Sequence, residues 1–211
     1  MQRKPQSPSA MNQPRARDLA EHQRHVKNLM ATIRSIALRT AEKSDSLEEF
    51  SAHFDGRLAA LSRTQRILSR AGAFDIDLEE MVLDELLAQA AREGTTVEGP
   101  SVRLSLKAAE ALGLALHELA VNAVKFGALA GPESQLSIAW CTDERGLVLQ
   151  WRESGVAAVD QQPSRSGFGR EWLERGLPYE LKAATQLEFL PGGVTCTITL
   201  PADQFAADAS P

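Results

Sequence analysis

Four polar residues interrupt an otherwise apolar stretch at residues 116–129, LHELAVNAVKFGAL, which belongs to a long predicted helix whose composition is typical of burial. They are His117, Glu118, Asn122 and Lys125. Steps of four and three residues put the last three side chains on one helix face. A carboxylate and an amide oxygen suit magnesium, and an ammonium group suits phosphate. The spacing favours a site for a metal and a polyphosphate, but a helix edge that emerges into water explains it about equally well.

Two glycine-containing segments follow, WRESG at 151–155 and SGFG at 166–169. Glycines near an acidic residue let a nucleotide approach the backbone closely. Each segment alone is a weak signal, because such glycines are common in turns. A tryptophan that ends a strand, as Trp151 does, usually packs in the core.

A stretch near the N-terminus, EHQRHVKNLMATIRSIALRT at 21–40, carries two histidines on a predicted amphipathic helix that begins near Asp18. Apolar residues at steps of three and four form one stripe, with Val26, Met30, Ile33 and Ala37 defining the direction of the core. His22 lies on the stripe and is predicted to pack. Arg24 points away from the core. His25 lies on the flank of the stripe, roughly at right angles to the direction of the core.

The next helix is predicted over residues 47–68, after a capping box made by Ser46 and Glu49. His53 lies beside its apolar Phe50–Phe54 face and is interpreted as a packing residue. A short connection between two amphipathic helices predicts an antiparallel hairpin. Such a hairpin cannot cover its own apolar stripe, so we expect dimerisation into a four-helix bundle.

Beyond Phe74 helices alternate with strands. A helix at 76–91 is capped by Asp77, and Glu85 falls among its periodic apolar positions. Within residues 168–181, the chain is predicted to be helical up to Gly176 and Pro178. The predicted strands are 101–106, two strands joined by the turn DERG at 143–146, and two strands, 185–190 and 194–201, on either side of PGG. This order predicts an α+β fold with helices on one face of a mixed sheet.

The composition of the 211 residues narrows the class of protein. Hydrophobic residues make up 43% of the chain, which is enough for a core, and the net charge of -5 does not favour nucleic-acid binding. No apolar run is long enough to span a membrane, and no secretory signal is present. The two cysteines, which form no CxxC pair, are predicted to be reduced thiols of a cytoplasmic protein. Residues 1–16 and 204–211 are predicted to be tails.

Three segments become specific when they are taken together. HELAVNAVKFGAL, WRES and GFGREWLERGLPYEL, in this order and separation, resemble the HWE family of bacterial histidine kinases. That family is named for a histidine in the asparagine-box helix and a Trp-x-Glu pair on a strand, which here are His117, Trp151 and Glu153. HVKNLMATIRSIALRT and FDGRLAALSRTQRIL resemble the family's dimerisation and phosphoacceptor hairpin. The resemblance covers about residues 18–203.

This resemblance implies a dimerisation and phosphotransfer hairpin at 17–73 and a GHKL-type ATP-binding domain, an α/β sandwich, at 74–203. ATP and Mg²⁺ are the implied cofactors, with Asn122 holding the metal, Lys125 contacting phosphate, and Glu118 supporting the metal or polarising a water. The resemblance places Trp151 and Glu153 where the superfamily reads adenine, and it makes Gly155, Gly167 and Gly169 shape the loop over the nucleotide. The catalytic candidates are His25, Glu118 and His117.

Three departures from the family pattern matter, and the first two concern the lid and the sensor. The acidic motif commonly continues with Gly-Gly-Pro, whereas this chain has SGVAAV, so the lid between Val156 and Ser166 is predicted to be atypical. The chain also carries no recognisable sensory domain. The sensor could be a separate protein, or the chain could be part of a longer one.

The phosphoacceptor position is the third departure. The family's box His-Arg-Val-Lys-Asn places the acceptor four residues before the asparagine, and counting back from Asn28 gives Arg24. A guanidinium group stays protonated and cannot attack a phosphoryl group, so His25 is the nearest substitute. Two readings remain open. The chain is a homodimeric kinase that phosphorylates His25 and passes the group to a response-regulator aspartate, or it is a degenerate kinase that acts as a phosphatase, phosphotransfer protein or receiver-binding scaffold.

Overall fold

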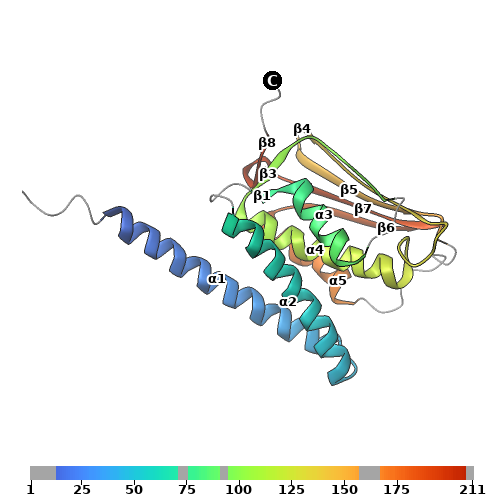
Figure 1. The fold of residues 1–211 in the computed structure, drawn as a ribbon, viewed down its shortest axis with the longest axis horizontal. Coiled ribbons are helices and arrows are strands. Elements are labelled where there is room, and N and C mark those ends of the chain that lie inside the picture. The colour runs from blue at the N-terminus through green and yellow to red at the C-terminus, as the bar shows by residue number, and fades with distance from the viewer. Residues whose placement is uncertain (1–12, 71–75, 91–94, 157–166, 208–211) are drawn as a thin grey trace, which may run out of the picture. The chain divides into compact units, whose positions relative to one another are not determined.

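The structure, a computed structural model, describes residues 13–70, 76–90, 95–156 and 167–207 (Figure 1). The chain divides into two compact units, residues 1–54 and 55–211. The division falls within helix α2 (Leu47–Arg70), so most of that helix belongs to the second unit. The predicted boundary between functional domains at residues 73 and 74 stays a prediction.

The first unit contains α1 (Gln13–Lys43) and the start of α2. The predicted cap at the start of α2 is present, because the Ser46 hydroxyl accepts the Glu49 backbone N–H at 3.1 Å. The Glu49 carboxylate accepts the N–H of Asp45 at 2.8 Å, where an ordinary capping box would use the N–H of Ser46. Both bonds satisfy donors at the turn between the helices and so fix where α2 begins.

The apolar stripe of α1 is only partly covered in the single chain. Ile36 is buried, and Ile33 and Ala37 are half-buried. Val26 and Met30, which are predicted to face the core, remain 51% and 60% exposed. The N-terminal part of the stripe therefore lies on the surface of the monomer.

The second unit is built on a mixed five-stranded sheet in the order β2-β4-β5-β7-β6. β2 and β4 are parallel and the other neighbours are antiparallel. A three-stranded sheet, β1-β3-β8, completes the unit. The strands are β1 (Ile76–Asp77), β2 (Thr95–Glu98), β3 (Val102–Leu104), β4 (Gln135–Asp143), β5 (Gly146–Ser154), β6 (Ala184–Leu190), β7 (Gly193–Leu200) and β8 (Phe205–Ala207).

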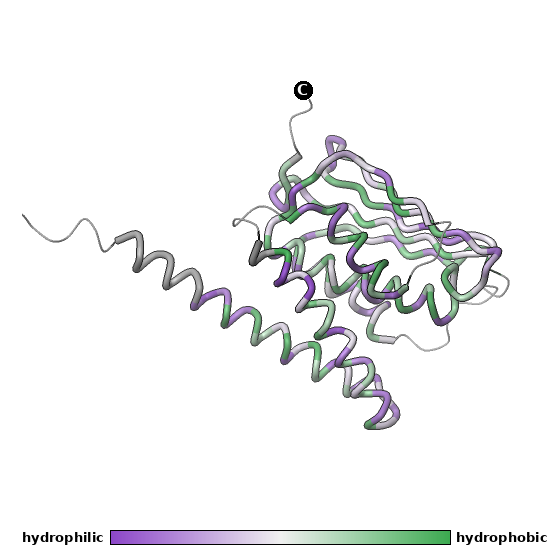
Figure 2. Tube along the Cα trace, in the orientation of Figure 1, coloured by the Kyte–Doolittle hydropathy of each residue, from purple (hydrophilic) through white to green (hydrophobic). Residues whose placement is uncertain are grey.

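Helices cover one face of the five-stranded sheet (Figure 1). They are α3 (Leu78–Ala88), α4 (Leu106–Phe126), α5 (Phe168–Glu171), the π-helix η1 (Trp172–Gly176) and α6 (Leu177–Leu181), and a short 3-10 helix, η2 (Ala202–Gln204), precedes β8. α4 is the central helix of the core, since nearly every residue from Ala108 to Ala120 is buried. Hydrophobic residues recur along the strands and helices of this unit, interspersed with hydrophilic ones (Figure 2). The predicted α+β class is confirmed.

Local chemistry explains why these elements begin and turn where they do. Asp77 caps α3 by accepting the Glu80 N–H at 3.1 Å, as predicted. Ser105 caps α4 in the same way through Ala108. The predicted turn at 143–146 joins β4 to β5, and Gly146 has a φ of 127° that favours glycine. The second predicted hairpin joins β6 to β7, with Gly192 at φ 83°.

One predicted helix end is wrong. The chain remains helical from Phe168 to Leu181 and passes through Pro178. Between the two α-helical turns the backbone widens into η1, where the Leu177 N–H bonds to the Trp172 carbonyl five residues back. This π-type turn changes the hydrogen-bond register, so Pro178 enters near the start of a new helical segment, where its missing N–H costs little.

Three short strands were not predicted from the sequence. β1 and β2 carry no clear alternation, and Phe205–Ala207, at the start of the predicted C-terminal tail, pair with β3 as β8. Residues 1–12 and 208–211 of the two predicted tails, and 157–166 of the predicted atypical lid, lie outside the described residues. Within the described part of the chain, no helix combines the length and apolar character needed to cross a membrane.

Candidate functional site

The polar residues of α4 divide into a buried pair and an exposed pair. His117 and Glu118 are buried, whereas Asn122 and Lys125 are exposed near the C-terminal end of the helix. The shared face of Glu118, Asn122 and Lys125 therefore runs from the interior to the surface. An amide and an ammonium group reach solvent at the end of a helix that is otherwise packed against the core.

His117 belongs to a buried cluster that joins α4 to α3 and α2. Its Nδ1 lies 2.9 Å from Oε1 of Glu85 on α3, and the other oxygen of Glu85 accepts from Arg63 on α2. Gly56, also on α2, leaves room for the ring, since a Cβ there would lie 3.1 Å from His117 Nε2. The imidazole thus connects three helices.

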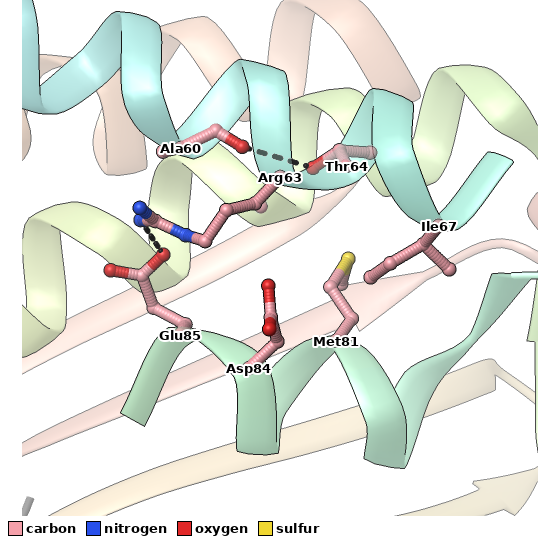
Figure 3. A pocket seen from close by; sticks show the side chains of 8 residues that line it. Ala60, Arg63, Thr64, Ile67, Met81, Asp84 and Glu85 are labelled. Atoms are coloured by element: carbon pink, nitrogen blue, oxygen red, sulfur yellow. Dashed lines mark hydrogen bonds and ion pairs between the residues drawn. The ribbon is translucent and has the colours of Figure 1, made fainter. Parts of the chain in front are cut away.

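Ion pairing controls the charge of Glu85. Burial disfavours its ionised form, but the hydrogen bonds and charges of His117 and Arg63 outweigh burial and hold the pKa of Glu85 below its ordinary value. Figure 3 shows Arg63 reaching Glu85 at the edge of a small cavity between α2 and α3. The cavity is also lined by Thr64, whose hydroxyl donates to the Ala60 carbonyl. The cluster is therefore an electrostatic contact between helices inside the second unit.

Glu118 is also held by an arginine of α2. Arg57 Nε donates to Oε1 at 2.7 Å, and Nη2 donates to Oε2 at 3.2 Å. Asn122 is exposed one turn further along α4, so the structure does not bring the Glu118 carboxylate and Asn122 together as an open pair of metal ligands. Among the described residues, no group of three or more His, Cys, Asp or Glu side chains could hold a metal ion.

Trp151 and Glu153 form a buried unit on β5. The indole Nε1 donates to Glu153 Oε1 at 2.9 Å, and Oε2 accepts the Ala128 backbone N–H at 2.8 Å. Burial raises the pKa of Glu153 above its ordinary value, and the two donated bonds offset only part of that effect. The carboxylate ties β5 to the loop that follows Asn122 and Lys125. A side chain at Gly127 would collide with it, since a Cβ there would lie 1.9 Å from Oε2.

The three candidate glycines differ in whether their surroundings leave room for a side chain. Gly155 has a φ of 73°, and a Cβ there would lie 2.9 Å from the Glu133 carbonyl oxygen, so glycine is needed on both counts. Gly169 is buried against Glu118, with a Cβ position only 2.6 Å from Oε2. Gly167 is exposed and has open space around it. Two of the three are therefore required by their surroundings.

Comparison with known proteins gives a family match over part of the chain. The family model described as HWE histidine kinase matches residues 21–101. The matched residues include the N-terminal helices and the cluster partners on α2 and α3. These residues and the relatives below support an HWE histidine kinase.

Curated relatives agree with this assignment. A blue-light-activated histidine kinase 1 from Erythrobacter litoralis is 30% identical over 193 residues, which cover 88% of this chain and 53% of that protein. A blue-light-activated histidine kinase from Brucella ovis is 32% identical over 181 residues, covering 83% of this chain and 37% of that protein. The chain thus spans about half or less of these relatives.

Solved structures support the fold. The histidine kinase domain of the Erythrobacter litoralis blue-light-activated histidine kinase superposes with a TM-score of 0.56 at 15% identity, over 82% of this chain and 95% of that one. A longer structure of that protein gives a TM-score of 0.58 at 20% identity, over 92% of this chain and 65% of that one. The HWE chain therefore has the histidine kinase domain fold.

The described N-terminal histidines and the α4 residues belong to different compact units of the chain. His25 is half-buried and Arg24 is exposed on α1, in the first unit, whereas the residues of α4 and β5 belong to the second. His53 lies 4.0 Å from Glu49. The side chain of His22 lies outside the described residues, so its predicted packing role stays a prediction.

Sequence reasoning missed the partners of the family residues. Arg57, Arg63 and Ala128 complete the contacts of Glu118, Glu85 and Glu153, but no motif marks them. One signal was available, because Glu85 falls within the apolar period of its helix. A charged residue at such a position needs a buried partner.

Proposed function

We propose that this HWE chain is the core of an ATP-dependent protein histidine kinase. The observation that carries the proposal is the arrangement at the end of α4. Asn122 and Lys125 are exposed there, and the loop that follows is fastened to β5 by the buried Trp151–Glu153 pair. A rigid support for two exposed polar groups is what phosphate and metal recognition requires.

The exposed groups fit a nucleotide with its metal. The Asn122 amide oxygen would hold Mg²⁺, and the Lys125 ammonium group would neutralise phosphate charge. When bound, Mg²⁺ would reduce the charge repulsion within the triphosphate. Gly155, with its positive φ at the end of β5, lets the backbone come close to a ligand without a side chain in the way. By the family resemblance Glu153 would contact adenine, with the Trp151 bond orienting its carboxylate.

The γ-phosphoryl acceptor in this proposal is His25. The bond from the γ-phosphorus to the β–γ bridging oxygen breaks as an imidazole nitrogen of His25 bonds to phosphorus, and ADP leaves. The phosphoryl group then passes to an aspartate of a response-regulator receiver domain. Such transfer depends on positioning and charge stabilisation more than on covalent chemistry by the protein.

The surface of α1 supports a homodimer. Val26 and Met30 are exposed in the single chain although they lie on the apolar stripe. A second copy of the same helices would cover that stripe in a four-helix bundle. The proposal places the dimer in the cytoplasm, where ATP and receiver domains are found and thiols stay reduced.

A second function is favoured by one observation, the replacement of the usual acceptor by Arg24. In that case the chain binds nucleotide but does not phosphorylate itself, and it acts as a phosphatase, a phosphotransfer protein or a receiver-binding scaffold. The buried Trp151–Glu153 support and the exposed Asn122 are then retained for nucleotide binding alone.

One experiment separates the two functions. The chain is incubated with γ-labelled ATP and magnesium, beside the variants His25→Ala and Asn122→Ala, with His53→Ala as a matched control on the next helix. Acid-labile, alkali-stable label that disappears in the first two variants and persists in the control supports the kinase. ATP binding without any label supports the second function, and label that survives in His25→Ala contradicts His25 as the acceptor.

A further inference from the structure

Arg24 and His25 are consecutive residues of α1 that differ in exposure. Arg24 is exposed, whereas His25 is half-buried on the flank of the apolar stripe. Both residues lie well inside the long helix Gln13–Lys43, so the helical backbone fixes the direction in which each side chain leaves α1. The guanidinium group of Arg24 is therefore accessible to a ligand that approaches this helix from solvent.

Arg24 differs in this respect from two arginines of the next helix. Arg57 donates to the buried carboxylate of Glu118, and Arg63 donates to that of Glu85. Those two arginines connect helices within the second unit. An exposed arginine such as Arg24 contributes little to the stability of a fold, so its place beside His25 points to chemistry at the helix surface.

Asn28 lies next to both residues, one helical turn further along. It follows Arg24 by four residues and His25 by three, which are the two spacings that bring side chains together on a helix. Asn28 is exposed, and helical side chains lean towards the N-terminus, so its amide points back to the turn that carries Arg24 and His25. An imidazole, a guanidinium group and an amide therefore border one patch of surface. N–H donors around a nucleophile suit the oxygens of a phosphoryl group.

We propose that Arg24 is a catalytic residue in the transfer of the γ-phosphoryl group to His25. This inference rests on the proposed function. The guanidinium N–H groups donate to the non-bridging oxygens of the γ-phosphoryl group while an imidazole nitrogen of His25 bonds to phosphorus. The bond from phosphorus to the β–γ bridging oxygen breaks, ADP leaves, and the other ring nitrogen gives its proton to water. The exchanged order Arg-His thus keeps a cation beside the nucleophile.

The expected effect is on the rate of transfer and not on the binding of ATP. An arginine that stabilises a transferring phosphoryl group accelerates such reactions by about 10³- to 10⁵-fold in enclosed sites. Arg24 is solvated, so we expect a smaller effect, about tenfold or more. Arg24 belongs to the first unit, whereas Asn122 and Lys125 of the nucleotide site belong to the second. Loss of Arg24 should therefore leave the affinity for Mg²⁺–ATP unchanged.

The test uses the full chain and its variants Arg24→Gln, Arg24→Lys and Arg24→Ala. Arg34→Gln is the matched control, because Arg34 is also an exposed arginine of α1. Each form is measured for Mg²⁺–ATP affinity and for the initial rate at which γ-labelled ATP gives acid-labile, alkali-stable label. Free guanidinium ion, at concentrations too low to unfold proteins, is added to Arg24→Ala and to Arg34→Gln as a chemical rescue.

The proposal predicts that Arg24→Gln and Arg24→Ala acquire label about tenfold more slowly or worse at normal affinity, with Arg24→Lys between them and the parent chain. Guanidinium ion should restore part of the rate in Arg24→Ala, which a merely structural role would not allow. Labelling of Arg24→Gln at the parent rate, or an equal loss in Arg34→Gln, overturns the role of Arg24 and leaves the kinase intact. If the parent chain acquires no label, the kinase itself fails and this inference fails with it.

Discussion

Trp151 donates its indole N–H to Glu153 at 2.9 Å, two residues further along β5 and on the same face of the strand. The other carboxylate oxygen accepts the Ala128 N–H from the loop after α4. Two residues that give the family part of its name therefore form a brace between the sheet and the helix that carries Asn122.

Removal of the indole donor tests this brace. Trp151→Phe should lower the free energy of unfolding by about 1–3 kcal/mol beyond the change in packing, because a buried charged acceptor loses a bond. Trp140→Phe is a matched control, since Trp140 donates to the neutral Pro100 carbonyl at 2.8 Å in a bond that is only partly buried. Urea denaturation measures both variants. An equal loss in the two would contradict a special role for the charged acceptor.

The Glu85 cluster predicts a pH-dependent contribution to stability. The folded protein holds the pKa of Glu85 below its ordinary value, so the unfolded chain takes up the proton first as the pH falls. The stabilisation is complete above the unfolded pKa and is lost as the pH drops through the folded value. Glu85→Gln should therefore cost about 3–5 kcal/mol near neutral pH, as expected when one partner of a buried pair is removed.

The check is a series of urea titrations of the parent protein and Glu85→Gln from neutral pH down to about pH 3.5, below the ordinary carboxyl range. The difference in unfolding free energy should shrink steadily below about pH 4.5. Glu153, whose shift has the opposite sign, is present in both proteins and cancels in the difference. A difference that stays constant with pH would show that Glu85 does not carry this ionisation.

The glycines that border the site can be ranked by substitution. Gly155→Ala should destabilise the fold by about 1–2 kcal/mol, because its φ of 73° is unfavourable for a residue with a Cβ and the Glu133 carbonyl is close. Gly167→Ala meets nothing within 4 Å and should change stability by about 0.5 kcal/mol or less. Thermal unfolding of the two variants gives the comparison, and equal melting temperatures would count against the strain at Gly155.

The two cysteines should differ in reactivity. Cys196 on β7 is buried, and burial raises the pKa of its thiol to about 12, while Cys141 on β4 is exposed. Iodoacetamide at about pH 8 should therefore modify one thiol in the folded protein and both in urea, because the thiolate is the reactive form. Mass spectrometry after digestion locates the label. Rapid modification of Cys196 in the native state would mean that the sheet opens locally, and Cys141→Ser serves as the unlabelled control.

The sequence predicted the elements with strong periodicity and recognisable caps. α3 with its Asp77 cap, the buried helix α4 and the two antiparallel hairpins follow from patterns within a few residues, whereas the Ser105 cap of α4 was not predicted. The π-helical turn before Pro178 did not follow, because a change of hydrogen-bond register leaves no periodic signature. β8 was missed because three residues acquire a strand conformation only by pairing with β3, about a hundred residues earlier.

In the candidate site, too, local patterns were predicted and long-range contacts were not. The spacing placed Asn122 and Lys125 on the emerging edge of α4, and both side chains are exposed there. His117 and Glu118 were expected to belong to the same site as Asn122 and Lys125, because all four lie on one helix. Their partners, Glu85 and Arg57, come from other helices 32 and 61 residues away, and only the packing of the fold brings them together.

Equilibrium binding of ATP in the presence and absence of magnesium tests the central claim most directly, with Asn122→Ala beside Gln135→Ala as an exposed control on β4. The account predicts saturable binding that requires magnesium, with Asn122→Ala weakened at least about tenfold, the lower end of what loss of a metal-site partner costs. The control should bind as the parent chain does. Absence of magnesium-dependent binding, or equal affinity in Asn122→Ala and the parent chain, would contradict it.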